Sequence, residues 1–417
     1  MRRSNVIIAS VVASTFFVGF GGGVIFPILP NLGAILGISP FMVGLILSAN
    51  RFSRLFANAP AGALVDRFGT RKPFVIGLFV EGIATFGYVI ALRSGSPEAW
   101  FLLARILWGL GSAAVFATAY TIAADVSEAR SRGVSMGIVR GGVLLGFPAG
   151  LVLGGIVSEL YGNPEAFVVA TAFALFASVL AFVTIPETHV DSGTRSSVKP
   201  WDVDGSIPAV TVGLVNFGLL FAFIGALFAT LVLFLEANEL TMPAIELFGV
   251  SFPAFGPQGT SGLFMAITVI SSSAFMLFGG YVSDRLDSRV PTLLGFVLVS
   301  GIGFILLALA NSLFTLAIAC IFIGAGQGGT SGPLTALLAD LTPQERMGRA
   351  TGTNNVFGDI GGGLGPMVSL PLIEIVGFAP VYAACAALPL LAGGVLLFGV
   401  RRETGTFLPE TNLVARQ

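Results

Sequence analysis

The chain has 417 residues, of which 55% are hydrophobic and 10% charged, and its formal net charge at pH 7 is −1. Soluble domains carry roughly 25% charged residues, so this composition excludes a chain whose whole surface faces water. The small net charge also excludes a general nucleic-acid binder, because such proteins need an excess of Lys and Arg.

Long apolar segments recur along nearly the whole chain. About 20 apolar residues in a helix can cross a hydrocarbon layer roughly 30 Å thick. The segments predict twelve membrane spans, at residues 5–29, 40–65, 74–93, 98–125, 133–157, 164–186, 207–235, 260–283, 292–310, 312–340, 348–373 and 378–400. The first follows Arg2 and Arg3 as in a signal peptide, but it stays apolar through Pro27, so we expect a retained helix.

Two charged turns repeat at half the chain length. The first charged turn (residues 62–73) lies between the second and third spans, and the second charged turn (residues 280–291) follows the eighth. Their matched pairs are Asp66/Asp284, Arg71/Arg289 and Pro73/Pro291, each 218 positions apart (284 − 66 = 218). Another set, Gly109/Gly324, Asp125/Asp340 and Gly133/Gly348, is 215 positions apart (340 − 125 = 215). The chain is therefore predicted to be a duplication with parallel repeats.

The duplication predicts an all-α polytopic membrane protein of twelve transmembrane helices in two pseudo-symmetric six-helix bundles. The predicted parts are an N-terminal bundle (1–186), a polar linker (187–205), a C-terminal bundle (206–402) and a tail (403–417). Residues 236–259 are expected to form an external loop. Sixteen of the 21 Lys and Arg residues then lie on the inner side and only Arg93 in an outer loop, which predicts a cytoplasmic location for both termini.

Several charged and amide residues fall inside the predicted spans. A charge at mid-bilayer costs roughly 2.5–3.5 kcal/mol on insertion scales, so each marks a cavity or a partner. The candidates for substrate or proton coupling are Arg51, Arg54, Arg105, Gln327, Asn355 and Asp359. Helix rise places Arg54 and Asp359 near the midplane. Arg105 could bind an anion, assist a proton relay or make a structural pair, whereas Glu81 in the third span is expected to be structural.

The charged turns, the spans and the repeat resemble those of the major facilitator superfamily. The resemblance extends over nearly the whole chain. The first charged turn is similar to the family's signature between helices 2 and 3, with Thr70 where a basic residue is usual. Arg105, Trp108, Gly109 and Gly111 resemble the helix-4 motif of proton-coupled members. The glycines of the fifth span partly resemble an antiporter motif, although Phe147 separates Gly146 from Pro148.

The resemblance implies a role for both charged turns in conformational gating. Gly62 would let another helix approach closely, and Asp66 would face the N-terminal end of helix 11. Arg71 would pair with Asp125, and Arg289 with Asp340, to latch the outward-open state. The gating candidates are Gly62, Asp66, Arg67, Gly69, Arg71, Asp125, Asp284, Arg289 and Asp340.

Helices 2 and 11 meet across the two halves in this family, which leads to a hypothesis about Arg54 and Asp359. The two would form an ion pair that a proton or the substrate breaks during transport. The alternative is that each side chain reaches water or bonds locally. The stretch that contains Asn355 and Asp359 is also similar to helix 11 of vesicular amine carriers.

The predicted function is secondary active transport of a small organic solute by alternating access, as proton-coupled efflux of drug-like or amphipathic compounds. The alternative is proton-coupled uptake of an organic anion, which the arginines of the first half favour. The expected partners are the solute, protons and the lipid bilayer of the cell membrane, with the chain as a monomer.

An enzyme or a receptor is the remote alternative. The chain has one histidine, His189, in a polar segment, and it lacks a phosphate-binding loop with Lys and Ser or Thr. We therefore expect no catalytic residues, no metal and no cofactor.

Overall fold

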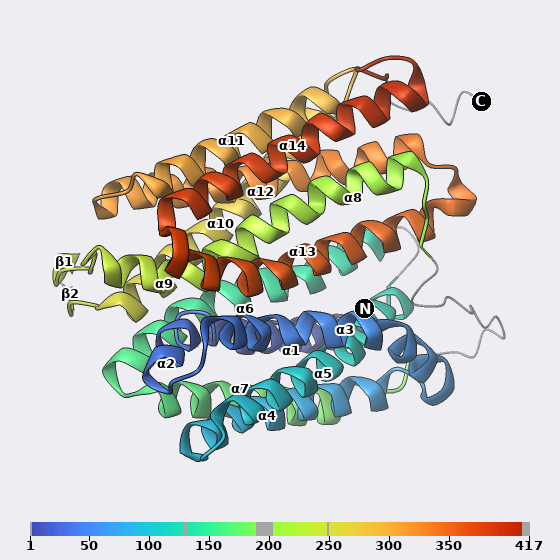
Figure 1. The fold of residues 1–417 in the computed structure, drawn as a ribbon. Coiled ribbons are helices and arrows are strands. Elements are labelled where there is room, and N and C mark those ends of the chain that lie inside the picture. The colour runs from blue at the N-terminus through green and yellow to red at the C-terminus, as the bar shows by residue number, and fades with distance from the viewer. Residues whose placement is uncertain (1, 128–131, 189–202, 248–249, 411–417) are drawn as a thin grey trace. The chain divides into compact units, whose positions relative to one another are not determined.

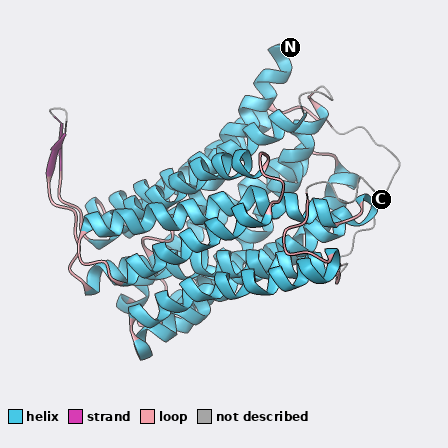
Figure 2. Ribbon diagram, turned by 90° about the horizontal axis from the view of Figure 1, so that it is seen from above, coloured by secondary structure: helices cyan, strands magenta, loops and turns pink. Residues whose placement is uncertain are grey.

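The computed structural model describes residues 2–127, 132–188, 203–247 and 250–410. Nearly all of them are helical (Figure 2). The strands in this part of the chain are β1 (Ile245–Leu247) and β2 (Val250–Phe252), an antiparallel hairpin in the predicted external loop. The prediction of an all-α protein is confirmed, with this hairpin as the addition.

Most of the helices within each half follow one another with short connections, apart from the segment with the hairpin between α9 and α10 (Figure 1). In the first half they are α1 (Arg2–Val24), α2 (Leu29–Ile35), α3 (Pro40–Phe68), α4 (Arg71–Arg93), α5 (Pro97–Asp125), α6 (Arg132–Leu160) and α7 (Asn163–Thr184). In the second half they are α8 (Ile207–Leu220), the π-helix η1 (Phe221–Leu227), α9 (Phe228–Ala237), α10 (Pro257–Ser283), α11 (Val290–Ala308), α12 (Leu313–Leu341), the 3₁₀ turn η2 (Gln344–Arg346), α13 (Met347–Val376) and α14 (Phe378–Thr404).

Short sequence signals begin several of these helices. Proline stands in the first turn of α3, α5, α7, α8, α10 and α11, where its missing N–H costs nothing. The Ser39 hydroxyl accepts from the Met42 N–H at 3.3 Å and caps α3, and Ser312 accepts from the Thr315 N–H at 3.2 Å and caps α12. The polar residues between the apolar segments therefore set where the helices start.

Eleven helical segments of the described chain are long and apolar enough to cross a membrane, with α8, η1 and α9 forming one continuous span, Ile207–Ala237. The twelfth long helix is α3, which has 29 residues and contains Arg51 and Arg54. These arginines lower its apolarity. The twelve-helix prediction is confirmed.

The chain divides into an N-terminal unit (Met1–Pro200 with Gln258–Ala266) and a C-terminal unit (Trp201–Pro257 with Ile267–Gln417). In the first, α1 packs against α6 and α7, and α4 packs against α5 and α7. In the second, α8 packs against α13 and α14, and α11 packs against α12 and α14. Helices at matching positions have matching neighbours, so the sequence duplication extends to packing.

Glycines set the closest helix contacts inside each unit. A Cβ atom on Gly154 would lie 2.8 Å from the Cα of Val24, so α1 and α6 meet almost backbone to backbone. In the C-terminal unit a Cβ atom on Gly303 would lie 2.6 Å from the backbone nitrogen of Ile323, between α11 and α12. Small residues at helix contacts are typical of packing in lipid, where close approach replaces the hydrophobic effect.

Candidate functional site

The first charged turn is a tight reversal between α3 and α4. Gly69 ends α3 with its N–H bonded to the Val65 carbonyl at 2.9 Å, and its φ of 78° is one that L side chains rarely adopt. A Cβ atom on Gly62 would meet no atom of its own unit within 4 Å, so close packing within this unit does not explain that glycine. The side chain of Asp66 lies outside the described residues.

Sequence reasoning missed the residue that holds this turn, Glu187. Its carboxylate accepts from the N–H and the hydroxyl of Thr70, at 2.7 and 2.9 Å, and from the N–H of Arg71 at 3.3 Å. It therefore caps the N-terminus of α4, where unpaired N–H groups and the helix dipole favour an anion. The only signal in the sequence was an acidic residue just after the sixth span.

The predicted pair of Arg71 with Asp125 is not among the described contacts, and as a latch of the outward-open state it stays a prediction. Arg71 instead donates from Nη2 to the Phe182 carbonyl at 2.7 Å, and its guanidinium carbon lies 5.2 Å from the centre of the Phe182 ring. Asp125 accepts from the Thr188 hydroxyl at 3.2 Å. Both residues thus bind the end of α7 and the segment after it, which is where the predicted linker begins.

The second charged turn contains the predicted pair. Arg289 donates from Nε to Asp340 Oδ2 at 3.0 Å and from Nη1 to Asp284 Oδ1. Burial would lower the pKa of Arg289, but hydrogen bonds and the charges of the two aspartates outweigh it and raise that pKa above its usual value. Arg289 is therefore a permanent cation that joins the end of α12 to the turn before α11.

Arg105 is fully buried, with 1% of its surface exposed. Its Nε donates to the Ile46 carbonyl at 3.2 Å, and its Nη2 donates to the Leu47 carbonyl at 2.8 Å and to Asn50 Oδ1 at 2.7 Å. The Trp108 ring lies 5.7 Å from the guanidinium. This contact set clamps α5 to α3, which favours structural pairing among the alternatives; an anion site and a proton relay stay predictions.

Arg51 and Arg54 are half-buried on α3, and Asp359 is half-buried on α13. Asn355 is exposed, one turn before Asp359. Arg54 belongs to the N-terminal unit and Asp359 to the C-terminal unit, so the hypothesis of an ion pair between them stays a prediction.

The face of α13 next to Asp359 is packed tightly on α8 and η1. The Asn216 amide donates to the Asn354 carbonyl at 2.9 Å, and a Cβ atom on Gly358 would lie 2.6 Å from that same amide nitrogen. About two turns further along α13, a Cβ atom on Gly225 would lie 2.6 Å from the Cα of Gly365. Gly225 is part of the π-helix, an element that often marks functional positions.

Gln327 lies on α12 among residues that pack closely on neighbouring helices. Its Oε1 is buried without a hydrogen-bond partner among the described residues. A side chain on the flanking Gly326 would clash with Ser300, and one on Gly328 would clash with Ser272. This part of α12 is therefore mostly a packing face, and Gln327 Oε1 is a buried acceptor in it without a partner among the described residues.

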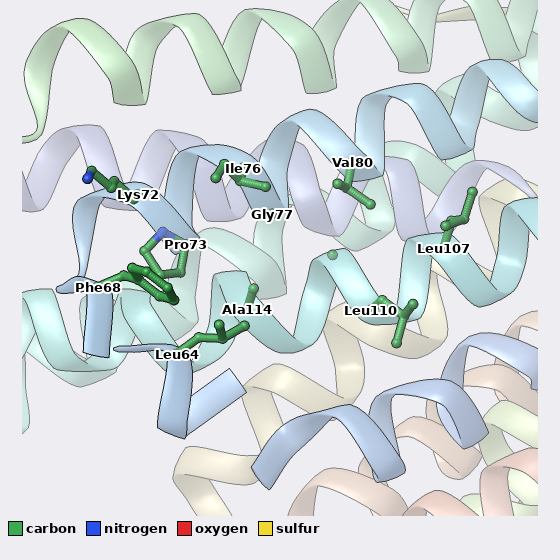
Figure 3. A pocket seen from close by; sticks show the side chains of 11 residues that line it. Leu64, Phe68, Lys72, Pro73, Ile76, Gly77, Val80, Leu107, Leu110 and Ala114 are labelled. Atoms are coloured by element: carbon green, nitrogen blue, oxygen red, sulfur yellow. The ribbon is translucent and has the colours of Figure 1, made fainter. Parts of the chain in front are cut away.

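An apolar groove of about 580 Å³ runs along the N-terminal unit at the end of the first charged turn. Figure 3 shows its walls, Leu64 and Phe68 from α3, Ile76 and Val80 from α4, and Leu107, Leu110 and Ala114 from α5. Lys72 is the one charged residue among the described residues that line it. The groove contains none of the residues predicted for substrate or proton coupling, and its lining suits hydrocarbon.

The described residues include no group of three or more His, Cys, Asp or Glu side chains placed to hold a metal ion. Cys320 and Cys385 are both buried and free. His189 lies outside the described residues.

Comparison with known proteins gives matches over nearly the full length. The family model described as Major Facilitator Superfamily matches residues 11–257 and 240–414. Multidrug resistance protein 1 of Bacillus subtilis is 25% identical over 400 residues, which cover 94% of this chain and 95% of that protein. Quinolone resistance protein NorA of Staphylococcus aureus is 23% identical over 411 residues, which cover 95% of this chain and 97% of NorA.

Solved structures agree with this fold. A bacterial homologue of the human lysosomal transporter Spinster, in an inward-facing and occupied conformation, superposes with a TM-score of 0.75. The match covers 95% of this chain and 96% of that one at 16% identity, which supports a shared fold.

Proposed function

The chain belongs to the major facilitator superfamily and is a membrane transporter, and from this premise we propose that it exports amphipathic, drug-like compounds in exchange for protons. The observation that carries the proposal is the half-buried carboxylate of Asp359 within a span. A carboxylate at that depth is costly when ionised, so it must have a partner or take up a proton. The names of the two relatives given above support the substrate class.

The proposed cycle couples one carboxylate to two alternating states. With Asp359 ionised, the positively charged Arg54 would hold the two bundles together on one side of the membrane. Substrate that binds from the inner side, or a proton that reaches Asp359 from the outer side, would break that attraction and let the bundles rock. Substrate leaves on the outer side, and proton release on the inner side restores the ionised carboxylate.

The charged turns are proposed to set the balance between these states. Arg289 holds Asp284 and Asp340 in one network, and Glu187 holds the first charged turn against the start of α4. Charge networks at helix ends stabilise one arrangement of the helices that they join. Arg67 and Lys72, both exposed, complete the positive edge of the N-terminal unit.

A second candidate function is uptake of an organic anion. Arg51 and Arg54 are half-buried, three residues apart on α3, and a basic cavity attracts anions. Arg105 supports this alternative less, because its Nε and Nη2 donate to groups on α3.

The proposal also covers the membrane, the oligomeric state and the orientation of the chain. The transporter would lie in the cell membrane as a monomer, with both termini and the linker in the cytoplasm. The asymmetric distribution of Lys and Arg supports that orientation.

The test uses inside-out membrane vesicles whose interior has been made acidic. Ethidium and other lipophilic cations are added, then organic anions such as salicylate, and a fluorescent dye follows the pH gradient. We expect the cations to dissipate the gradient with the natural chain, and the signal to fall roughly tenfold or more with Asp359→Asn. Glu403→Gln, which removes an exposed carboxylate outside both charged turns, is the matched control and should leave the signal unchanged.

The outcomes separate the candidate functions. A response to anions without one to cations would favour anion transport. A response to cations that Asp359→Asn leaves intact would remove Asp359 from the coupling mechanism. No response to any compound would contradict proton-coupled export of this class.

A further inference from the structure

The apolar groove of the N-terminal unit lies at the depth of a membrane span. Two of its walls, α4 and α5, are both long and apolar enough to cross a membrane. A Cβ atom on Gly77 would lie 2.8 Å from the Gly111 carbonyl oxygen, so the helices meet closely where neither carries a side chain. Glu81, 1% exposed, packs against Gly111 at this contact and does not line the groove. Ile76 and Leu110 are exposed on its sides, so the groove is a hollow in an apolar surface.

The length of the groove matches one leaflet of a bilayer. In Figure 3 Lys72 and Phe68 lie at one end of the groove, and Val80 and Leu107 lie toward the other. Along α4 the helix rises about 12 Å from Lys72 to Val80. One leaflet contributes about 15 Å to a hydrocarbon layer roughly 30 Å thick. An acyl chain that follows the groove would therefore have its headgroup close to Lys72.

Two cations lie at this end of the groove. Lys72 lines the groove and is exposed. Arg67 is exposed too, and its guanidinium carbon lies 5.1 Å from the centre of the Phe68 ring, which belongs to the groove wall. The neighbouring Arg71 is turned away, because its guanidinium donates to the Phe182 carbonyl. Lys72 and Arg67 are thus the positive charges placed to meet a ligand of the groove.

A phospholipid with a net negative headgroup matches both the lining and the charges. Its acyl chain would cover the exposed apolar walls, and its phosphate would lie where Lys and Arg attract anionic lipid. A water-soluble partner would have to enter the hydrocarbon layer to reach these walls. A lipophilic cation would meet two positive charges at the end of the groove, which disfavours it.

We propose that this groove binds one anionic phospholipid, with an acyl chain between α4 and α5 and the phosphate beside Lys72 and Arg67. The acyl chain would fill the hollow that Gly77 and Gly111 leave between the two helices. The headgroup would lie next to the first charged turn, so the lipid would join α3, α4 and α5 at that turn. Neither proton coupling nor the transported compound enters this binding.

The test measures bound lipid by native mass spectrometry of the full chain in detergent. Dioleoyl phosphatidylglycerol, which is anionic, and dioleoyl phosphatidylcholine, which is neutral overall and has the same acyl chains, are added in equal amounts. We expect the natural chain to retain the anionic lipid in preference, and Lys72→Gln to lower this preference roughly fivefold. Lys72→Arg keeps the charge and should keep the preference. The matched control is Arg402→Gln, which removes an exposed cation of α14 outside the groove and should also keep it.

A second variant tests the groove without changing any charge. Ala114 is half-buried in the groove wall, so Ala114→Leu places a larger side chain in the space of the acyl chain. We expect this variant to retain one lipid fewer than the natural chain. Ala172→Leu, on an exposed position of α7 outside the groove, is its matched control and should retain the same number. Size-exclusion chromatography in detergent checks that each variant is folded before it is measured.

Several results would overturn this assignment. Equal retention of the two lipids by the natural chain would remove the role of the charges. An equal loss of preference in Lys72→Gln and Arg402→Gln would mean that surface charge alone attracts the lipid. Full retention by Ala114→Leu would place the lipid outside the groove. Displacement of the lipid by ethidium would assign the groove to a transported compound, and a dimer that Ala114→Leu dissociates would assign it to a second copy of the chain.

Discussion

Glu187 shows how one residue can organise a charged turn. Its carboxylate takes up the hydrogen bonds of two N–H groups at the start of α4, and its neighbour Thr188 bonds both Thr70 and Asp125. The first residues after the sixth span are therefore hydrogen-bonded to the first charged turn. The predicted linker begins at Glu187, so its first two residues are anchored.

Replacing Glu187 tests this cap. In Glu187→Ala the N–H groups of Thr70 and Arg71 lose their acceptor, and loss of a cap costs about 0.5–2 kcal/mol of stability. We expect a lower melting temperature of the purified protein in detergent. Glu403→Ala removes an exposed carboxylate at the end of α14 and should leave the melting temperature unchanged. Equal melting temperatures for the two variants would show that the cap contributes nothing.

Replacing Gly69 tests the same turn in a second way. Gly69→Ala places a side chain at a φ of 78° and in the space of the Glu187 carboxylate, so two penalties act together. We expect a larger loss of thermal stability than in Gly95→Ala, where nothing lies within 4 Å of the added atom. A tolerated Gly69→Ala would mean that Glu187 can leave its position at no cost.

The two charged turns differ in how they use their arginines, and double-mutant cycles can measure the difference. Arg289 and Asp340 are in contact, with 15% and 11% of their side chains exposed. Their combined replacement by Ala should therefore show a coupling free energy of about 0.5–3 kcal/mol in unfolding experiments. Arg71 and Asp125 share no contact among the described residues, and their replacements should be additive. A coupling free energy between Arg71 and Asp125, with none between Arg289 and Asp340, would contradict the geometry.

At the scale of elements, the contact between α8–η1 and α13 decides where Asp359 lies. Gly358, Gly361 and Gly365 face Asn216, Phe217 and Gly225, so that this face of α13 is closed by packing. Asp359 and Asn355 are left outside this contact. The π-helix places Gly225 against Gly365 of α13, the residue that precedes Pro366.

Gly225→Ala tests the importance of this contact. The added Cβ atom would lie 2.6 Å from the Cα of Gly365, so α13 must shift together with Asp359. We expect loss of transport of ethidium in vesicles, with protein still present in the membrane. Gly394→Ala on α14, where nothing lies within 4 Å of the added atom, is the matched control. Full transport by Gly225→Ala would show that the contact does not position Asp359.

The helices were predictable from sequence because membrane spans follow from length and apolarity alone. The first span, the charged turns and the Gly-rich contacts could all be read from residue type and spacing. The π-helix could not, since one extra residue in a turn leaves no mark in an apolar segment. The cap by Glu187 and the burial of Glu81 could not either, because both depend on which helices meet.

At the scale of the whole molecule, duplication explains why the units share their packing yet differ in chemistry. Matching helices have matching neighbours in the two units. The buried Arg105 and Glu81 belong to the N-terminal unit, and Asp359 belongs to the C-terminal unit. The side chains at the matching positions of the other unit are uncharged, although the packing of the helices has been kept.

The predicted orientation can be tested with single cysteines. Ser94→Cys lies between α4 and α5 and is expected outside, whereas Asp287→Cys lies in the second charged turn and is expected inside. Cys320 and Cys385 are buried and should react little. A membrane-impermeant maleimide should label Ser94→Cys in intact cells and Asp287→Cys only after permeabilisation. The reverse pattern would invert the predicted topology.

Proton-driven export is the central claim, and concentrative transport tests it most directly. The purified chain is reconstituted in liposomes with an acidic interior, and the accumulation of ethidium is followed by fluorescence against its own gradient. The account predicts that ethidium accumulates above its external concentration and that a protonophore collapses this accumulation. Ethidium that only equilibrates, at the same rate with and without the pH gradient, would contradict proton coupling.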